Sequence, residues 1–442
     1  MQRLFVPKET RAGETRVAAT PDTVKRLIKD GLKVVVEAGA GLGSFISDDE
    51  YRQAGAEIAT SRDSALREAD IVVHVNIPTT ELVWGMQQGA SLVSYIWPVD
   101  PPQHELMKVL AEHKISALAM DAIPRITRAQ KDDALSSQAN LAGYKAVLLA
   151  AAQLPKIFPM MTTAAGTIRP ARVVVIGAGV AGLQAIATAK RLGAIVEVSD
   201  VRPEVKEQAH SLGATYIEVE GVEVKQGTGG YAAEQSEEFK RKQAELLHER
   251  IAAADVVICT ALIPYRDAPK IVTEQMVKDM RPGSVIVDLA AERGGNCALT
   301  KPGDMNHVAH GVTIMGAIKL EDTVSVHASQ TYAKNIQNLL SDLIKEGKLV
   351  WDLEDAIVQG ALVAHAGEII HAQTRQAMGL GEQKAPVKEE AKPSEEPKPE
   401  AGQDAQAEAN AAAQSSSESG EAAQAETSGD QSAESTKEGE GA

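Results

Sequence analysis

The stretch Arg172-Val-Val-Val-Ile-Gly177-Ala-Gly179-Val-Ala-Gly182-Leu-Gln-Ala decides the fold. Its apolar run predicts a buried strand, and the glycines follow at the start of a helical pattern. Gly177 can make the tight turn, Gly179 lets the backbone approach a pyrophosphate, and Gly182 lets helix and strand pack closely. This order of strand, glycine turn and helix is typical of a dinucleotide-binding α/β domain. The alternative is a strand-to-helix connection without a ligand.

A carboxylate stands where such a site needs one. The strand predicted at Ile195–Ser199 ends at Asp200, eighteen residues after Gly182, where an acid would bind the adenosine ribose hydroxyls. A carboxylate there accepts a hydrogen bond from a free 2′-hydroxyl and repels a 2′-phosphate, so NAD(H) is favoured over NADP(H). Arg202 could accept a phosphate, or could pair with Glu204 or Glu207 in solvent.

The rest of the chain alternates short β-rich runs with helical patterns, which predicts parallel sheets with crossover helices. We therefore expect an α/β fold with two Rossmann-like, doubly wound parallel-sheet domains and a cleft between them. The helical patterns His327–Glu346 and Glu354–Ile370 have no strands of their own, and at least the first should pack back on the N-terminal domain. The predicted domains are residues 1–135 with 325–383, and 136–324 for the NAD-binding domain.

The C-terminal segment 384–442 has another character. Val387 is its only apolar residue larger than alanine, and its net charge of −9 leaves only −7 of the chain's −16 for the other residues. Such a segment cannot bury enough apolar surface to offset the entropy of ordering, so we expect a disordered acidic tail.

Composition also excludes several classes of function. The sequence has no basic patch of the kind that binds nucleic acid, so we expect no nucleic-acid partner. No apolar run is long enough to cross a membrane, so we expect no direct membrane insertion. The two cysteines, Cys259 and Cys297, match no metal-ligand spacing, so no metal is predicted. The N-terminus lacks the apolar core of a signal peptide, and a reducing cytoplasm fits best.

Further segments carry a family resemblance. The opening Pro7-Lys-Glu-Thr-Arg-Ala-Gly-Glu-Thr-Arg16-Val-Ala-Ala-Thr-Pro21 resembles that of the family shared by alanine dehydrogenases and transhydrogenase NAD-binding subunits. The run from Pro124 to Tyr144 looks more specifically like the transhydrogenase branch. So do Gly177–Ala194, Asp200-Val-Arg-Pro, Thr228-Gly-Gly-Tyr231-Ala, Thr260–Pro264 and Gly294-Gly-Asn-Cys297.

The resemblance implies a function and a set of site residues. Arg125, Gln130, Asp133 and Ser136 would orient the nicotinamide and its ribose, and the last three share one face if their stretch is helical. A helix cap formed by Asp132 or Asp133 is the alternative. Tyr231, in the long loop Glu218–Ser236, would close over bound nucleotide. The other implied contacts are Ile126, Thr127, Arg128, Val180, Val201, Gly230, Gln243 and Leu262, of which the apolar members could equally be core.

The same resemblance implies partners. This chain would hold NAD(H) as a homodimer, and the NADP-binding domain of a beta subunit would hold NADP(H). Membrane-spanning subunits would couple hydride transfer to proton translocation, which places this chain on the cytoplasmic face of the inner membrane as a peripheral subunit.

Two other functions remain open. An alanine dehydrogenase needs a lysine and a histidine on the keto acid, but the matching strands read Val73-His74-Val75-Asn76-Ile77-Pro78 and Ser94-Tyr95-Ile96-Trp97-Pro98, and only His74 could substitute. A non-catalytic NAD-binding regulatory module could use the acidic tail to engage a partner. The run Ile318-Lys-Leu-Glu-Asp322 and Arg293 depart from the family pattern.

Overall fold

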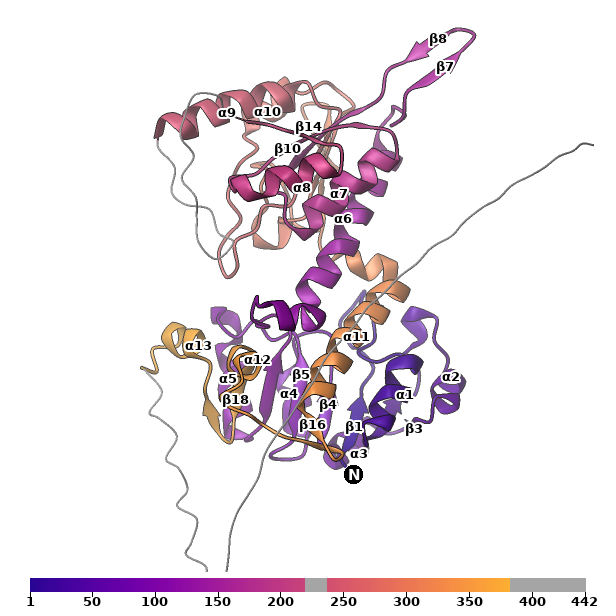
Figure 1. Cartoon of the computed structure of the whole chain (residues 1–442), viewed down its shortest axis with the longest axis vertical. Coiled ribbons are helices and arrows are strands. Elements are labelled where there is room, and N and C mark those ends of the chain that lie inside the picture. The colour runs from indigo at the N-terminus through magenta and orange to yellow at the C-terminus, as the bar shows by residue number, and fades with distance from the viewer. Residues whose placement is uncertain (219–236, 382–442) are drawn as a thin grey trace, which may run out of the picture. The chain divides into compact units, whose positions relative to one another are not determined.

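A computed structural model of the chain describes residues 1–218 and 237–381. Two large sheets organise these residues, each with helices packed on it (Figure 1). The fold class predicted from sequence, α/β with Rossmann-like parallel sheets, is confirmed; the cleft between the two domains stays a prediction.

The first sheet combines the N-terminal strands with two strands from near the end of the described chain. In spatial order its members are β19 (Glu368–Ile369), β18 (Leu362–His365), β6 (Ser116–Ala119), β5 (Ser91–Ser94), β4 (Ile71–Val73), β1 (Arg3–Val6), β2 (Lys33–Glu37) and β3 (Glu57–Ala59). Successive residues face opposite cores: Leu4 and Val6 belong to one apolar cluster and Phe5 to the other. Burial on both faces explains why its strands are almost wholly apolar.

Helices cover this sheet on both sides. They are α1 (Pro21–Lys29), α2 (Asp48–Gln53), α3 (Arg62–Glu68), α4 (Thr80–Gly85), α5 (His104–Glu112), α11 (Ser325–Leu343), α12 (Ala356–Ala361) and α13 (Ala372–Ala377). As expected from the sequence, α11 packs on the N-terminal elements: the Tyr332 hydroxyl donates a 2.9 Å hydrogen bond to the carbonyl of His74.

The second sheet has the strand order of a dinucleotide-binding domain. Its parallel strands are β11 (Thr215–Tyr216), β10 (Ile195–Ser199), β9 (Arg172–Ile176), β12 (Val256–Cys259), β13 (Val285–Asp288) and β15 (Val312–Gly316), with β14 (His307–Ala309) antiparallel at the edge. Taken in chain order the parallel strands run 3-2-1-4-5-6, so the connections reverse direction between β9 and β12, where such sheets bind nucleotides. The accompanying helices are α7 (Val180–Arg191), α8 (Lys206–Ser211), α9 (Glu237–Ala252) and α10 (Glu274–Asp279).

The long helix α6 (Ala134–Gln153) leads from the first group of elements to the second (Figure 1). It crosses α7 at Gly143, where an added Cβ would lie 2.1 Å from the carbonyl oxygen of Ala181. Only glycine permits this approach, so α6 and the start of α7 are held together.

Two parts of the fold differ from the sequence-based expectation. The helix predicted over Glu354–Ile370 is wrong beyond Ala361, because β18 and β19 follow there and β18 pairs antiparallel with β6. An unpaired β6 edge would expose backbone donors and acceptors, and β18 covers it. A hairpin of β7 (Met161–Thr163) and β8 (Gly166–Ile168) was not expected; it extends away from the second sheet (Figure 1).

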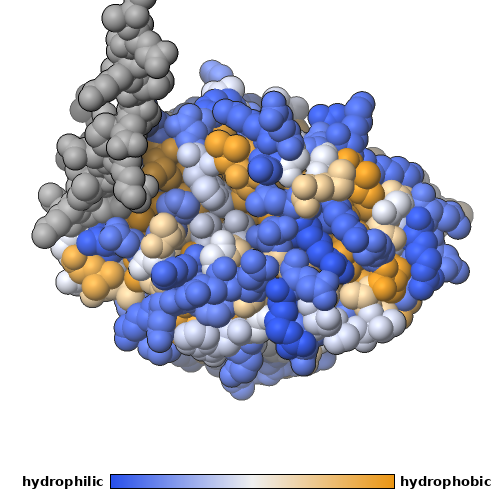
Figure 2. Space-filling model, turned by 90° about the horizontal axis from the view of Figure 1, so that it is seen from below, coloured by the Kyte–Doolittle hydropathy of each residue, from blue (hydrophilic) through white to orange (hydrophobic). Residues whose placement is uncertain are grey.

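The remaining short elements are β16 (Ile344–Lys345), β17 (Lys348–Leu349) and the 3₁₀ turns η1 (Leu42–Ser44), η2 (Pro101–Gln103), η3 (Thr127–Asp132), η4 (Pro203–Val205), η5 (Ala291–Arg293) and η6 (Leu320–Val324). No described helix is long and apolar enough to cross a membrane. Figure 2 shows one face of the molecule, on which hydrophilic residues dominate and hydrophobic residues form small separate groups. The predicted tail, from residue 384, lies outside the described residues.

Candidate dinucleotide site

The glycine turn has the geometry that its spacing predicts. Gly177 follows β9 with φ +91°, a conformation that L side chains rarely adopt, and its N–H donates to the carbonyl of Ser199 at 2.8 Å. A Cβ on Gly182 would lie 1.9 Å from the carbonyl oxygen of Gly177. A Cβ on Gly179 would meet no described residue within 4 Å. Gly179 begins α7 without a side-chain cap, which leaves first-turn N–H groups for an anion.

Asp200 stands beside this turn, with its side chain 4% exposed. Its carboxylate accepts hydrogen bonds from the N–H of Ala178 at 2.6 Å and of Arg202 at 2.8 Å. The Arg202 guanidinium also binds it, at 3.0 and 2.9 Å. Arg202 therefore pairs with Asp200, and not with Glu204 or Glu207 as one interpretation of the sequence suggested. Hydrogen bonding to Asp200 raises the pKa of Arg202 above its ordinary value.

Three apolar side chains surround the turn and remain in solvent. Val180 is 40% exposed, Val201 43% and Leu262 51%. They follow β9, β10 and β12 at the carboxyl edge of the sheet. The sequence left open whether these residues are core; the structure shows that they are not. An apolar rim beside a carboxylate and a glycine turn fits a nucleoside, which has flat apolar faces and polar hydroxyls.

Sequence reasoning missed the residue that shapes the loop after β12. The Asn296 side chain accepts from the N–H of Ala261 at 3.0 Å and donates to the carbonyls of Ala261 and Pro269 at 2.8 and 2.9 Å. Asn296 is fully buried. The adjacent Gly295 has φ +82°, and a Cβ there would lie 2.5 Å from the Asp288 carboxylate. The run Gly294-Gly-Asn thus carried a signal for a buried support of the Leu262 loop.

The residues expected at the nicotinamide lie where α6 begins. Asp133 caps α6, its carboxylate accepting from the Ser136 N–H at 2.9 Å and the Ser136 hydroxyl at 2.6 Å. The capping alternative is therefore correct in geometry, and it leaves a binding role open. The helical face predicted for Gln130, Asp133 and Ser136 is interrupted, because Gln130 lies in η3 and Asp133 has ψ 89°. Local hydrogen bonding by an N-cap residue opposes a continuous helix here.

Residues before α6 form an exposed polar segment. Arg125, Ile126, Thr127, Arg128 and Gln130 are all exposed. The Arg128 guanidinium pairs with Asp355 at 2.7 Å. Ser136 precedes Gly143 by seven residues, or about 10 Å along the helix at 1.5 Å per residue. Ser136 thus stands about two helical turns along α6 from the point where α6 meets α7.

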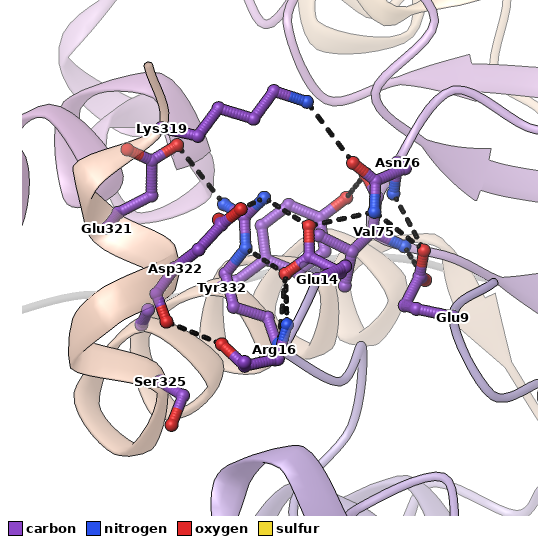
Figure 3. A network of polar contacts seen from close by, with 12 residues as sticks. Glu9, Glu14, Arg16, Val75, Asn76, Lys319, Glu321, Asp322, Ser325 and Tyr332 are labelled. Carbon is purple, nitrogen blue, oxygen red and sulfur yellow. Dashed lines mark hydrogen bonds and ion pairs between the residues drawn. The ribbon is translucent and has the colours of Figure 1, made fainter. Parts of the chain in front are cut away.

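A buried charge network ties the opening segment to η6 (Figure 3) and also reaches α6. Arg16, whose side chain is 2% exposed, binds Glu14 through two hydrogen bonds of 2.8 Å and pairs with Asp322 at 3.0 Å. It also donates to Gln138 of α6 at 3.1 Å. Burial opposes ionisation of Glu14, but the hydrogen bonds and charge of Arg16 outweigh it and lower the pKa of Glu14 to about 2. Lys319, in the run that departs from the family pattern, donates to Asn76 at 3.3 Å.

His74 is the residue that would have to bind the keto acid if the chain were an alanine dehydrogenase. His74 is 4% exposed, with Nδ1 2.8 Å from the Asn76 carbonyl and Nε2 3.3 Å from the Glu9 carboxylate. Both ring nitrogens thus have partners within the protein, as in a structural histidine.

Trp97 stacks with Arg293, whose guanidinium carbon lies 5.4 Å from the ring centroid.

The remaining predicted contacts are only partly described. Gly230 and Tyr231 lie outside the described residues. Gln243 is half-buried on α9. Among the residues that the structure describes, no group of three or more His, Cys, Asp or Glu side chains could hold a metal ion.

Comparison with known proteins covers nearly all of the described chain. Residues 5–142 match the family described as alanine dehydrogenase/PNT, N-terminal domain, and residues 146–372 match alanine dehydrogenase/PNT, C-terminal domain. An NAD(P) transhydrogenase subunit alpha chain of Rhodospirillum rubrum is 47% identical over 84% of this chain and 98% of its own length. An alanine dehydrogenase of Bacillus subtilis is 30% identical over 75% of this chain and 85% of its own length.

A solved structure agrees with the first of these relatives. The crystal structure of transhydrogenase from Sinorhizobium meliloti is 44% identical, with a TM-score of 0.76, and covers 84% of this chain and 100% of that one. Both domains of the family are thus present, and the higher identities are to transhydrogenases. The chain therefore belongs to the alanine dehydrogenase/PNT family, in its NAD(P) transhydrogenase alpha-subunit branch.

Proposed function

We propose that this chain binds NAD(H) at the second sheet and passes hydride between NADH and NADP⁺ held by a partner subunit. The observation that carries the proposal is the carboxyl edge of that sheet, where Asp200 and the solvent-exposed Val180, Val201 and Leu262 surround the glycine turn. When bound, the nicotinamide supplies the hydride. The residues of this chain position it, because hydride transfer depends on placing the two rings together with water excluded.

The proposed site has a division of roles. Gly177, Gly179 and the start of α7 receive the pyrophosphate, and Asp200 accepts the adenosine ribose hydroxyls after Arg202 yields part of its contact. The exposed segment before α6, through Arg125, Ile126, Thr127, Arg128 and Gln130, and the first turn of α6, through Asp133 and Ser136, receive the nicotinamide ribose and amide. Gly230, Tyr231 and Gln243 complete the proposed set.

The assembly is part of the proposal. NADP(H) would lie on the NADP-binding domain of a beta subunit, membrane-spanning subunits would couple transfer to proton translocation, and this chain would sit at the cytoplasmic face as a peripheral subunit. The names of the relatives, subunits of transhydrogenases, support a complex. We further propose that residues 1–135 with 325–383, and 136–324, are the domains.

A homodimer is proposed on the exposed apolar surface of the hairpin β7–β8. Met160 is 65% exposed, and Met161 and Ile168 are each 45% exposed. A depression at the base of the hairpin is lined mainly by apolar residues, among them Leu154, Pro155, Ile157, Phe158 and Pro159, together with Lys156 and Arg191. Apolar arms and apolar depressions on one chain suit a twofold contact, in which each copy provides the arm that the other receives.

The proposal is tested by mixing this protein with an NADP-binding transhydrogenase domain and measuring hydride transfer from NADH to an NADP⁺ analogue. Pyruvate with ammonia is the parallel assay. Transfer that needs both proteins, with none on pyruvate, supports the proposal. Oxidation of NADH by this chain alone that requires both pyruvate and ammonia would contradict it and favour an amino-acid dehydrogenase.

The positioning role is tested by Gln130→Asn, which shortens the side chain and keeps its amide. We expect slower transfer per bound NADH with nearly unchanged NADH affinity, because only the transition-state geometry is lost. Gln88→Asn is the matched control, since Gln88 is an exposed residue between α4 and β5. Loss of binding with a normal transfer rate per bound NADH would show that Gln130 has no positioning role.

A further inference from the structure

Asp132, the last residue of η3, is a buried carboxyl group that receives no hydrogen bond from any residue the structure describes. Its side chain is 0% exposed, and within residues 1–218 and 237–381 neither carboxylate oxygen has a hydrogen-bond partner. Leaving an ionised carboxylate in such a place costs far more than burying a neutral acid. Asp132 directly precedes Asp133, the cap of α6, and follows Gln130 by two residues.

A second unpartnered acceptor lies at the same junction. The Asn335 amide group of α11 donates to the carbonyl of Lys131 at 2.8 Å, and that of Asn338 donates to the same carbonyl at 3.0 Å. The other end of the Asn335 side chain, Oδ1, is buried and has no hydrogen-bond partner in the described part of the chain. The packing of η3 on α11 thus buries carboxylate and amide oxygens that are able to accept hydrogen bonds but receive none from the described residues. A proton on Asp132 would remove the charge and add a donor.

The charged groups around Asp132 already have partners elsewhere. Lys131 of η3 pairs with Asp342 of α11 at 2.6 Å, and Arg128 of η3 pairs with Asp355, at the start of α12, at 2.7 Å. Burial raises the pKa of Asp132 to about 6, with Lys131 and Arg128 opposing the rise and Asp342 adding to it. The contacts between η3 and α11 therefore favour a protonated carboxyl group at Asp132.

We propose that Asp132 is a proton-binding positioning residue, which holds η3 on α11 when protonated and releases it when ionised. Release of η3 displaces Gln130 and weakens the Asp133 cap of α6, so the nicotinamide side of the site loses its fixed geometry. This last consequence rests on the proposed function. The protonation-dependent packing of η3 does not.

The packing is tested on the full chain by amide hydrogen exchange of residues 127–136 between about pH 5 and about pH 8, expressed as protection relative to the unstructured peptide. In the wild type we expect protection to fall as pH rises, by at most about tenfold per pH unit, because opening a neutral buried site releases one proton. Asp132→Asn keeps the shape and cannot ionise, so its protection should be high and independent of pH. Asp132→Leu, which removes all polar atoms, should also be independent of pH.

Asp342→Asn is the matched control, because it removes a neighbouring charge and keeps Asp132. Loss of the Asp342 charge and release of Lys131 both favour ionised Asp132, so the transition should remain and move to lower pH. The same pH profile in wild type and Asp132→Asn, or no transition in the wild type, would overturn the proposal.

Hydride transfer to a docked NADP-binding domain is measured in parallel. A wild-type transfer rate that falls with rising pH while that of Asp132→Asn stays level supports the effect on positioning. Absence of transfer in both proteins would contradict the proposed function, while the exchange experiment would still decide whether Asp132 controls the packing of η3.

Discussion

Gly182→Ala and Gly179→Ala should separate folding from binding within one motif. In Gly182→Ala the new methyl group would lie 1.9 Å from the carbonyl oxygen of Gly177, whereas ordinary contact begins at 3.4 Å. Relief requires α7 to move away from the turn by more than about 1 Å. Overpacking of this kind typically costs about 1–3 kcal/mol, so we expect a clear loss in the free energy of unfolding.

Gly179→Ala is the matched change. Its methyl group would meet none of the residues that the structure describes within 4 Å, and its φ of −74° is ordinary for alanine. Replacing glycine lowers the conformational entropy of the unfolded chain, which stabilises the fold by about 0.4–1 kcal/mol. Alanine is a poorer N-cap than glycine, which offsets this gain, so the free energy of unfolding should hardly change. The methyl group would occupy the space that a pyrophosphate needs. We therefore expect NADH binding to weaken by more than about tenfold, or ~1.4 kcal/mol.

Urea unfolding and NADH titration by fluorescence measure both quantities on the same preparations. Each variant should fail in one assay: Gly182→Ala in stability and Gly179→Ala in affinity. If Gly179→Ala bound NADH as tightly as the wild type, the pyrophosphate would not lie against Gly179, and the proposed orientation of the cofactor would be refuted.

Four further predictions use other contacts. Glu14→Gln should flatten the fall in the free energy of unfolding at acid pH. Because the pKa of Glu14 is about 2 in the folded chain instead of 4.5, its ionisation stabilises the wild type by about 3 kcal/mol above pH 4.5, and this stabilisation is lost as pH falls towards 2. An unchanged acid dependence in the variant would contradict this. Arg202→Ala should weaken NADPH binding and spare NADH, because Asp200 then faces a 2′-phosphate without its cation; equal effects on both would argue against it. Asp133→Ala should cost about 1–2 kcal/mol in urea unfolding through loss of the α6 cap, and no loss would disprove the cap. Deleting residues 160–169 should convert the proposed dimer to a monomer by light scattering, and a dimer that persisted would exclude the hairpin as the contact.

The sequence predicted the second sheet well because its signals are local. The turn at Gly177, the strand after it and Asp200 follow within one strand-helix-strand unit, where spacing determines position. Arg202 shows the limit: its partner Asp200 is two residues away, yet the sequence suggested Glu204 or Glu207. Spacing alone does not choose among nearby carboxylates that could each pair with a guanidinium.

Non-local features were less predictable. The strand β18 reads as helix in isolation, and only the open edge of β6 makes it a strand. The burial of Asp132 against α11 likewise depends on a helix about two hundred residues further along the chain. Val180, Val201 and Leu262 look like core residues in sequence, and only their common edge leaves them in solvent.

The pairing of β18 with β6 also sets an order of events during synthesis. Leu362 follows Ala119 by 243 positions, so at a translation rate of 5–20 residues per second the edge of β6 waits roughly 10–50 s for its neighbour. All strands of the second sheet leave the ribosome within that interval. That sheet can fold first, while the earlier-made strands of the first sheet still present an open edge that a chaperone could cover. In this protein the sheet whose first strands are synthesised earliest is therefore the last to be completed.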